Sequence, residues 1–168
     1  NQSIIPSGST VILPGDTISI VVKPEHSAKA LRFTGKPRIK PRRIVLIGAT
    51  QITRLVLRKF SIQDSRQLAV VERDSAVCEA FAQEFPNVLV IHGNITDEGI
   101  FKDEDLGSYD MLISLTDSDE LNVIIASYCK QEGIGCSMAV IRSNNSYARL
   151  ARHMGIDSIV SAQEVTVD

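Results

Sequence analysis

The chain has 168 residues, of which 43% are hydrophobic and 23% charged, as in an ordinary soluble globular protein with room for one full domain and a smaller piece. No apolar run approaches the roughly 20 residues of a membrane-spanning helix, and the first residues lack the basic-then-apolar layout of a secretory signal peptide. The net charge of −2 is unevenly divided, because the first 43 residues carry a net +6 and the rest carry −8. Such asymmetry is typical of a domain boundary.

Residues 1–24 have the pattern of the end of a small β-rich domain. Two apolar runs, Thr10–Leu13 and Thr17–Val22, flank Pro14-Gly15-Asp16, which suits a type II turn because glycine accepts the positive φ at its third position. A lone hairpin is only marginally stable, so these strands need partners. We therefore expect the chain to be a fragment of a longer protein.

Residues 25–41 are predicted to form a short helix, over 25–33, followed by a basic linker. Much of the positive charge lies in residues 31–43, and two interpretations are open: an arm for nucleic acid or anionic lipid, or a solvated linker. The linker is favoured because Phe33 is the stretch's single aromatic residue and the acidic domain that follows would repel phosphates. We accordingly expect no nucleic-acid partner.

From residue 42 to residue 168 short apolar segments alternate with helical patterns. Six of these segments read as strands without polar alternation, as expected for parallel strands buried on both faces. They span residues 42–48, 68–72, 87–93, 109–115, 136–142 and 157–161. The pattern predicts an α/β fold, a Rossmann-like doubly wound parallel six-stranded sheet, preceded by the partial small β-rich domain. Ligands of such sheets bind at the carboxyl ends of the strands.

The turn after the first strand, "GATQIT" over residues 48–53, is similar to a dinucleotide-binding fingerprint, G-x-G-x-x-G. Gly48 supplies the first glycine, but Thr50 and Thr53 stand at the other two. Thr50 adds a side chain where a pyrophosphate would lie, and Thr53 adds bulk where helix and strand pack. Three interpretations stay open: a working nucleotide site, a relic that keeps the fold, and a turn that never bound a ligand.

Polar residues follow the other strands. Glu72, 24 positions after Gly48, matches the acid that binds the ribose hydroxyls of NAD, with Arg73 beside it for an adenine ring. Gly93 and Asn94 permit a turn whose backbone would line an adenine pocket. Arg142 follows the fifth strand, where its guanidinium would reach a phosphate group of the ligand. Each of these residues is also open to a structural interpretation, as an ordinary charged or polar residue at the end of a strand.

The acidic loop "SLTDSDE" after the fourth strand has two interpretations. Thr116 lies where it would line a ligand site, yet Thr116 and Asp117, with Asp119 and Glu120, are also suited to cap the following helix, and capping is the favoured interpretation for the acids.

No catalytic set is apparent in the sequence. The three cysteines are odd in number and lack C-x-x-C spacing, and the three histidines are scattered, which disfavours zinc, other metals and a disulfide framework. Strand ends carry no nucleophile paired with a base, and a second domain that would hold a substrate is lacking. We therefore expect no enzyme, with a small NAD-dependent enzyme as the less favoured alternative.

Five segments together resemble the RCK (KTN) domains of the TrkA family, the regulators of bacterial Trk/Ktr potassium uptake. They are "RRIVLIGATQIT", "AVVERD", "VIHGNITDE", "LISLTDSDELNVIIASYCK" and "IRSNNSYARLARHMGIDSIVSAQEVT". The upstream "IIPSGSTVILPGDTISIVV" resembles the tail of a TrkA-C-type domain. The resemblance covers nearly the whole chain and implies a TrkA-C-like piece over 1–24 and a TrkA-N nucleotide-binding domain over 42–168.

The resemblance implies a cytoplasmic subunit, peripheral to the inner (plasma) membrane, that binds NAD(H) or ATP/ADP and gates a membrane-embedded K⁺ transporter of Trk/Ktr type. It also implies a homo-oligomer through the Rossmann domains. A ligand-free structural and dimerisation domain is the alternative, because Thr50 and Thr53 depart from the family's glycine motif. The expected cofactor-binding residues are Gly48, Ala49, Thr50, Gln51, Ile52, Glu72, Arg73, Asn94, Ile95, Thr116 and Arg142.

Overall fold

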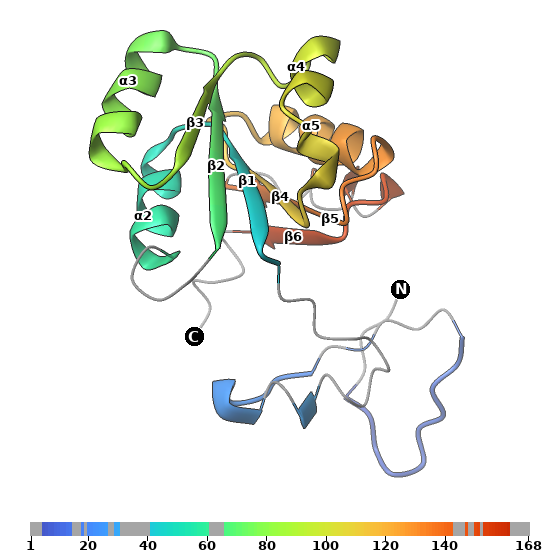
Figure 1. Cartoon of the computed structure of the whole chain (residues 1–168). Coiled ribbons are helices and arrows are strands. Elements are labelled where there is room, and N and C mark those ends of the chain that lie inside the picture. Colours follow the sequence, from blue (N-terminus) through green and yellow to red (C-terminus); the bar gives the residue numbers. More distant parts are fainter. Residues whose placement is uncertain are drawn as a thin grey trace. The chain divides into compact units, whose positions relative to one another are not determined.

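The computed structural model divides the chain into two compact units, residues 1–40 and 41–168 (Figure 1). It describes residues 5–14, 18, 20–26, 29–30, 41–60, 66–142, 147, 150–151 and 153–161. Within these residues no helix is both long and apolar enough to traverse a bilayer.

The described residues of the first unit include the 3₁₀ turn η1 at Pro24–His26 and helical conformation at residues 29 and 30. The strand predicted at Thr10–Leu13 is wrong, because these residues are irregular and their apolar side chains are exposed, with Val11 75% accessible. Two strands without neighbours bury too little apolar surface to be stable, which explains this difference. The turn at 15–17, most of the helix predicted over 25–33 and the linker to residue 40 lie outside the described residues.

The second unit is built on a six-stranded, all-parallel sheet in the order β3-β2-β1-β4-β5-β6 (Figure 1). The strands are β1 (Arg43–Ile47), β2 (Gln67–Glu72), β3 (Leu89–His92), β4 (Met111–Ser114), β5 (Cys136–Ile141) and β6 (Ser158–Ser161). This is the strand order of the Rossmann fold, with the switch point between β1 and β4. The predicted fold class is confirmed, and each strand falls within about two residues of its predicted bounds.

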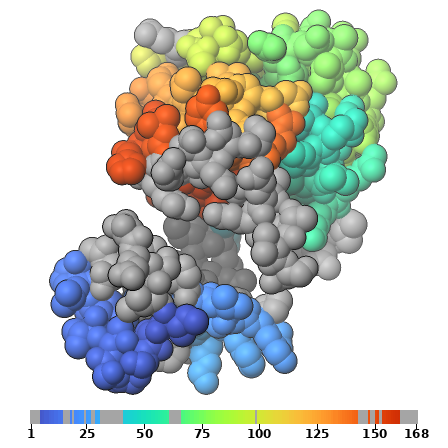
Figure 2. All heavy atoms as spheres, turned by 180° about the vertical axis from the view of Figure 1, so that it is seen from behind, coloured from blue at the N-terminus to red at the C-terminus, as the bar shows by residue number. Residues whose placement is uncertain are grey.

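Helices cover both faces of this sheet. They are α2 (Gln51–Phe60), α3 (Ser75–Glu84), α4 (Glu98–Asp103) and α5 (Asp119–Gln131), with the 3₁₀ turn η2 at Leu106–Ser108. The view from behind places α5, in yellow to orange, and the pair α2 and α3, in cyan to green, on opposite sides of this unit (Figure 2). The helix predicted before β6 is described only in part, with helical conformation at residues 147, 150, 151 and 153.

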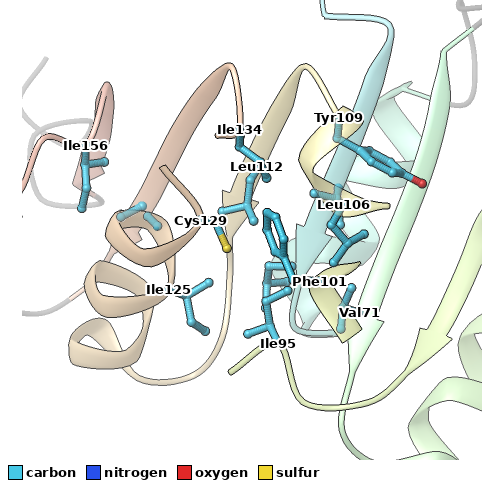
Figure 3. Close-up of a cluster of buried hydrophobic side chains, with 14 of the residues drawn as sticks. Val71, Ile95, Phe101, Leu106, Tyr109, Leu112, Ile125, Cys129, Ile134 and Ile156 are labelled. Atoms are coloured by element: carbon cyan, nitrogen blue, oxygen red, sulfur yellow. The ribbon is translucent and has the colours of Figure 1, made fainter. Parts of the chain in front are cut away.

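Because side chains of a strand alternate between faces, the continuous apolar strands supply two separate cores. Ile44 and Leu46 of β1 pack with Leu57 of α2 and Phe81 of α3. On the other face Val45 joins a larger cluster with residues of α4, η2 and α5. Figure 3 shows this second cluster, including Val71, Phe101, Leu112 and Cys129. Because β1 pairs in parallel with both β2 and β4, the carboxyl ends of these three strands lie at one edge of the sheet.

A partly exposed ion pair links Asp157, the residue before β6, to Lys130 of α5. The Asp157 carboxylate accepts hydrogen bonds from the Ser137 N–H and from Lys130 Nζ, each at 2.8 Å. Burial alone would raise the pKa of Asp157, but these hydrogen bonds outweigh it and hold the pKa below the ordinary aspartate value of 3.8.

The lowered pKa predicts a pH-dependent stability difference for Asp157→Asn. A folded-state pKa below the unfolded one contributes stability above pH 3.8 that is lost as the pH falls through the folded-state value. The variant should therefore be less stable than the unmodified chain at pH 7, and the gap should narrow towards pH 3 in urea unfolding. Asp103→Asn on α4 is the control. A gap for Asp157→Asn that stays constant over this range would contradict the linkage.

Candidate functional site

A pocket of about 340 Å³ opens at the carboxyl ends of the first strands. It lies at the switch point beside β1, where open α/β sheets bind their ligands, and its volume falls in the range of small-molecule sites. The lining residues are Ile47, Gly48, Thr50, Val71, Glu72, Arg73, Gly93, Asn94, Ile95, Thr116, Asp117, Ser118, Leu121 and Ile125. An apolar floor with polar groups at its rim is the usual make-up of such a site.

Gly48 forms the tight turn that leaves β1. Its φ of +96° lies in the region that side-chain-bearing residues avoid, and a Cβ here would come within 3.0 Å of the Thr116 Cα. The Gly48 N–H donates to the Val71 carbonyl oxygen at 2.9 Å. The glycine is therefore required both by the backbone conformation and by the close approach of the loop after β4.

The two threonines that replace glycines form a reciprocal cap at the start of α2. The Thr50 hydroxyl accepts from the Thr53 N–H at 3.4 Å, and the Thr53 hydroxyl accepts from the Thr50 N–H at 3.3 Å, as in a capping box. Thr50 Oγ1 also donates to the Leu115 carbonyl oxygen at 3.0 Å. The hydroxyl of Thr53, which is fully buried, donates to the Gly48 carbonyl oxygen. The bulk of Thr53 is thus accommodated by a hydrogen bond inside the turn.

Two amides of the first helical turn remain open. Across the described part of the chain, no hydrogen bond is formed by the N–H of Gln51 or of Ile52. Unpaired N–H groups at a helix start, with the partial positive charge of the helix dipole, favour an anion. The cap uses side chains and leaves these two donors without a hydrogen bond to another described residue.

The Glu72 carboxylate lies at the end of β2 and bridges to the turn after β1. Its Oε2 accepts from the Ala49 N–H at 2.8 Å, and its Oε1 accepts from the N–H groups of Arg73 at 2.8 Å and Asp74 at 3.0 Å. Three backbone donors thus fix the carboxylate at the pocket wall. The hydrogen bond from the Ala49 N–H also ties the turn after β1 to the end of β2.

Residues after β3 complete one wall of the pocket. Asn94 and Ile95 follow Gly93, whose N–H donates to the Glu72 carbonyl oxygen at 2.8 Å. The Asn94 Oδ1 accepts from the Thr96 N–H at 3.3 Å, which shapes the turn, and Ile95 is buried. This wall therefore presents an apolar surface and an amide beside Glu72.

The loop between β4 and α5 differs from the expected cap. Ser118 is the N-cap of α5, because its hydroxyl accepts from the Leu121 N–H at 3.1 Å. Thr116 instead contacts the buried Asn122, and Asp119 is buried and accepts from the Arg142 N–H at 2.9 Å. The N-cap is therefore Ser118 and none of the four residues predicted for that role, although Asp119 and Glu120 do lie in the first turn of α5.

Arg142 stands at the end of β5 but outside the pocket lining. Its Nη1 donates to Asp117 Oδ1 at 2.9 Å, and its Nη2 donates to the Thr116 carbonyl oxygen at 3.3 Å. Because Asp117 is 85% exposed, this ion pair adds little stability. The guanidinium lies over the loop that borders the pocket, and its predicted contact with a phosphate stays a prediction.

The structure brings together most of the predicted site residues. Seven line the pocket: Gly48, Thr50, Glu72, Arg73, Asn94, Ile95 and Thr116. Four do not: Ala49, Gln51, Ile52 and Arg142. Gly93, expected with Asn94 to form a turn lining an adenine pocket, also lines it, whereas sequence reasoning missed the apolar lining from Ile47, Val71, Leu121 and Ile125, along with Asp117 and Ser118. The apolar residues carried no signal of their own because they also belong to the core pattern of strand and helix.

The cysteines are free thiols. Burial raises the pKa of Cys129 to about 12, and burial with the nearby Glu72 and Asp74 charges raises the pKa of Cys78. Burial also raises the pKa of Cys136. All three are therefore protonated near neutral pH, which disfavours a thiolate nucleophile.

Comparison with known proteins gives a consistent result. The TrkA-N domain family matches residues 44–162. The chain is 30% identical over 169 residues to the Trk system potassium uptake protein trkA homolog 1 of Methanosarcina mazei, covering 100% of this chain and 41% of the relative. It is 31% identical over 167 residues to the Trk system potassium uptake protein TrkA of Haemophilus influenzae, covering 99% of this chain and 36% of the relative. The chain thus spans about two fifths of these relatives.

Two solved structures share the fold. The TrkA-N domain of inner membrane protein ybaL from Escherichia coli superposes with a TM-score of 0.62 at 17% identity, over 75% of this chain and 91% of that one. The GsuK channel bound to NAD has a TM-score of 0.62 at 21% identity, over 74% of this chain and 22% of that one.

Proposed function

This chain belongs to the TrkA-N family, and from that premise we propose that it is part of a regulatory subunit of a potassium uptake system whose pocket binds NAD(H) or ATP/ADP. The observation that carries the proposal is the arrangement at the switch point. The Gly48 turn and the Glu72 carboxylate line one pocket, and the N–H groups of Gln51 and Ile52, which are not part of that lining, follow the turn at the start of α2. These are the groups that a pyrophosphate and a ribose require.

The relatives support the partner and the ligand class. The curated relatives are described as Trk system potassium uptake proteins, and the GsuK structure is described as a channel bound to NAD. We extend this to a cytoplasmic subunit, peripheral to the membrane, that gates a Trk/Ktr-type transporter. Regulation of this kind requires a nucleotide that binds two states of the assembly with different affinities.

Titration tests the nucleotide part of the proposal. The purified chain is titrated with NADH, NAD⁺, ATP and ADP by calorimetry, with thermal shift as a second readout. We expect saturable binding of at least one of the four and a rise in melting temperature, since a ligand that binds only the folded state stabilises it. The absence of both effects at millimolar ligand would refute the nucleotide site.

A second candidate, a ligand-free structural and pairing domain, is favoured by one specific observation. The groups that would meet a nucleotide already have internal partners: Thr50 and Thr53 cap each other, and Glu72 accepts three backbone N–H groups.

The variant Thr50→Gly separates the two candidates. It restores the second glycine of the fingerprint, and a cap changed from threonine to glycine costs only a few tenths of a kcal/mol. If the pocket binds nucleotide, removing this side chain from its lining should tighten ADP and NADH binding in calorimetry. Thr96→Gly, in the turn after β3, is the control. A variant that binds no nucleotide would favour the structural candidate.

A further inference from the structure

Asn122 occupies an unusual place on α5. It is fully buried, yet both atoms of its side-chain amide are satisfied. Its Oδ1 accepts from the Ser114 hydroxyl at 3.0 Å, the Thr116 N–H at 2.8 Å and the Thr116 hydroxyl at 2.7 Å. Its Nδ2 donates to the carbonyl oxygens of Thr116 at 3.1 Å and Val140 at 2.9 Å. A fully satisfied buried amide of this kind fixes local geometry strongly.

The hydrogen bonds of Asn122 constrain one pocket residue, Thr116. Asn122 binds the N–H, the hydroxyl and the carbonyl oxygen of Thr116, and so fixes both the backbone and the side chain of that residue. Thr116 in turn lines the pocket and packs against Gly48, where a Cβ would lie 3.0 Å from its Cα. The bond to Val140 anchors the whole loop to the end of β5.

We propose that Asn122 is a positioning residue that fixes the Thr116 loop against the Gly48 turn and thereby sets the space open to the phosphate part of a nucleotide. The proposal rests on the proposed function, since it concerns the same pocket. Asn122 does not line that pocket, so its effect passes through Thr116. The adenosine end of a ligand, beside Glu72 and Asn94 across the pocket, should be largely independent of it.

The amide is needed because the site demands both acceptors and donors. Asn122→Asp keeps the shape and the Oδ1 acceptor, but it places a second oxygen against the carbonyl oxygens of Thr116 and Val140. Two donated hydrogen bonds become two oxygen–oxygen contacts, so the loop must move. Ser114→Ala is a milder variant, because it removes one hydrogen bond to Asn122 from a buried residue outside the pocket lining.

The test compares two ligands in each protein by NMR titration, which follows millimolar binding. For Asn122→Asp we expect ADP affinity to fall about tenfold and adenosine affinity to stay within about twofold, and for Ser114→Ala a loss of ADP affinity of about threefold. Ser127→Ala is the matched control, since Ser127 is a buried α5 residue whose hydroxyl donates to the Met154 carbonyl oxygen away from the pocket. It should change neither affinity.

The outcomes separate this proposal from the proposed function. Equal losses for ADP and adenosine, or equal effects of Ser127→Ala and Ser114→Ala, would mean that Asn122 is only structural and would overturn the positioning role while leaving the nucleotide site intact. An unmodified chain that binds neither ligand would remove the proposed function and this role together. If Asn122→Asp fails to fold, the ratio of ADP to adenosine affinity in Ser114→Ala decides.

Discussion

Gly48→Ala is expected to lower the free energy of unfolding by about 2–4 kcal/mol and to abolish measurable nucleotide binding. Two independent costs combine at this residue. An alanine is strained at a φ of +96°, and its Cβ would lie 3.0 Å from Thr116 Cα and 3.1 Å from Thr116 N. Both contacts are backbone atoms, which cannot rotate away. Relief requires movement of the loop that Asn122 fixes, and this would deform the pocket.

Gly133→Ala is the matched control for Gly48→Ala. Gly133 also has a positive φ, +105°, but a Cβ there would meet nothing within 4 Å. This variant therefore suffers the backbone strain alone, which we expect to cost about 1–2 kcal/mol, and it should bind nucleotide normally. Urea unfolding of both variants measures the difference. Equal destabilisation would show that the close approach of Thr116 to the turn is not a constraint.

Glu72→Ala is expected to weaken ADP and NADH binding at least tenfold and to destabilise the chain by about 1–3 kcal/mol. The variant removes the acceptor of three backbone N–H groups, those of Ala49, Arg73 and Asp74. The contact to Ala49 crosses from β2 to the turn after β1, so the variant should disturb this turn as well as remove the proposed contact to the ribose. Calorimetry measures the affinity and urea unfolding the stability.

Glu79→Ala provides the control for charge, because Glu79 is an exposed acid on α3. It should leave affinity and stability within about 0.5 kcal/mol of the unmodified chain. If Glu72→Ala destabilises as expected but binds nucleotide with unchanged affinity, Glu72 is a structural residue of the turn and has no part in the site.

The sheet could be predicted from the sequence because the patterns that mark its strands are local and occur repeatedly along the chain. Each strand is a short apolar run, and turn residues such as Gly48 and Gly133 mark where elements end. The position of the pocket followed from the parallel topology alone, since the carboxyl ends of β1, β2 and β4 share one edge. Glu72 was identifiable because its spacing from Gly48 reflects the length of one strand-helix-strand unit.

Features that depend on contacts between distant segments could not be predicted from the sequence. Asn122 reads as an ordinary polar residue of a helix, and its role depends on Val140, 18 positions away. The pairing of Arg142 with Asp117 spans 25 positions. Thr53 was expected to crowd the helix, yet its hydroxyl returns to the Gly48 carbonyl oxygen within the same turn. The strand pattern at Thr10–Leu13 failed for the opposite reason, because a local pattern without partner strands does not determine a sheet.

A crystal structure of the chain grown with NADH or ADP tests the central claim most directly. The account predicts a pyrophosphate above Gly48 within hydrogen-bonding distance of the Gln51 and Ile52 N–H groups, and ribose hydroxyls at the Glu72 carboxylate. Glu72 would keep at least one of its backbone contacts while it accepts from the ribose. An empty pocket at saturating ligand, or a nucleotide bound elsewhere on the chain, would contradict it.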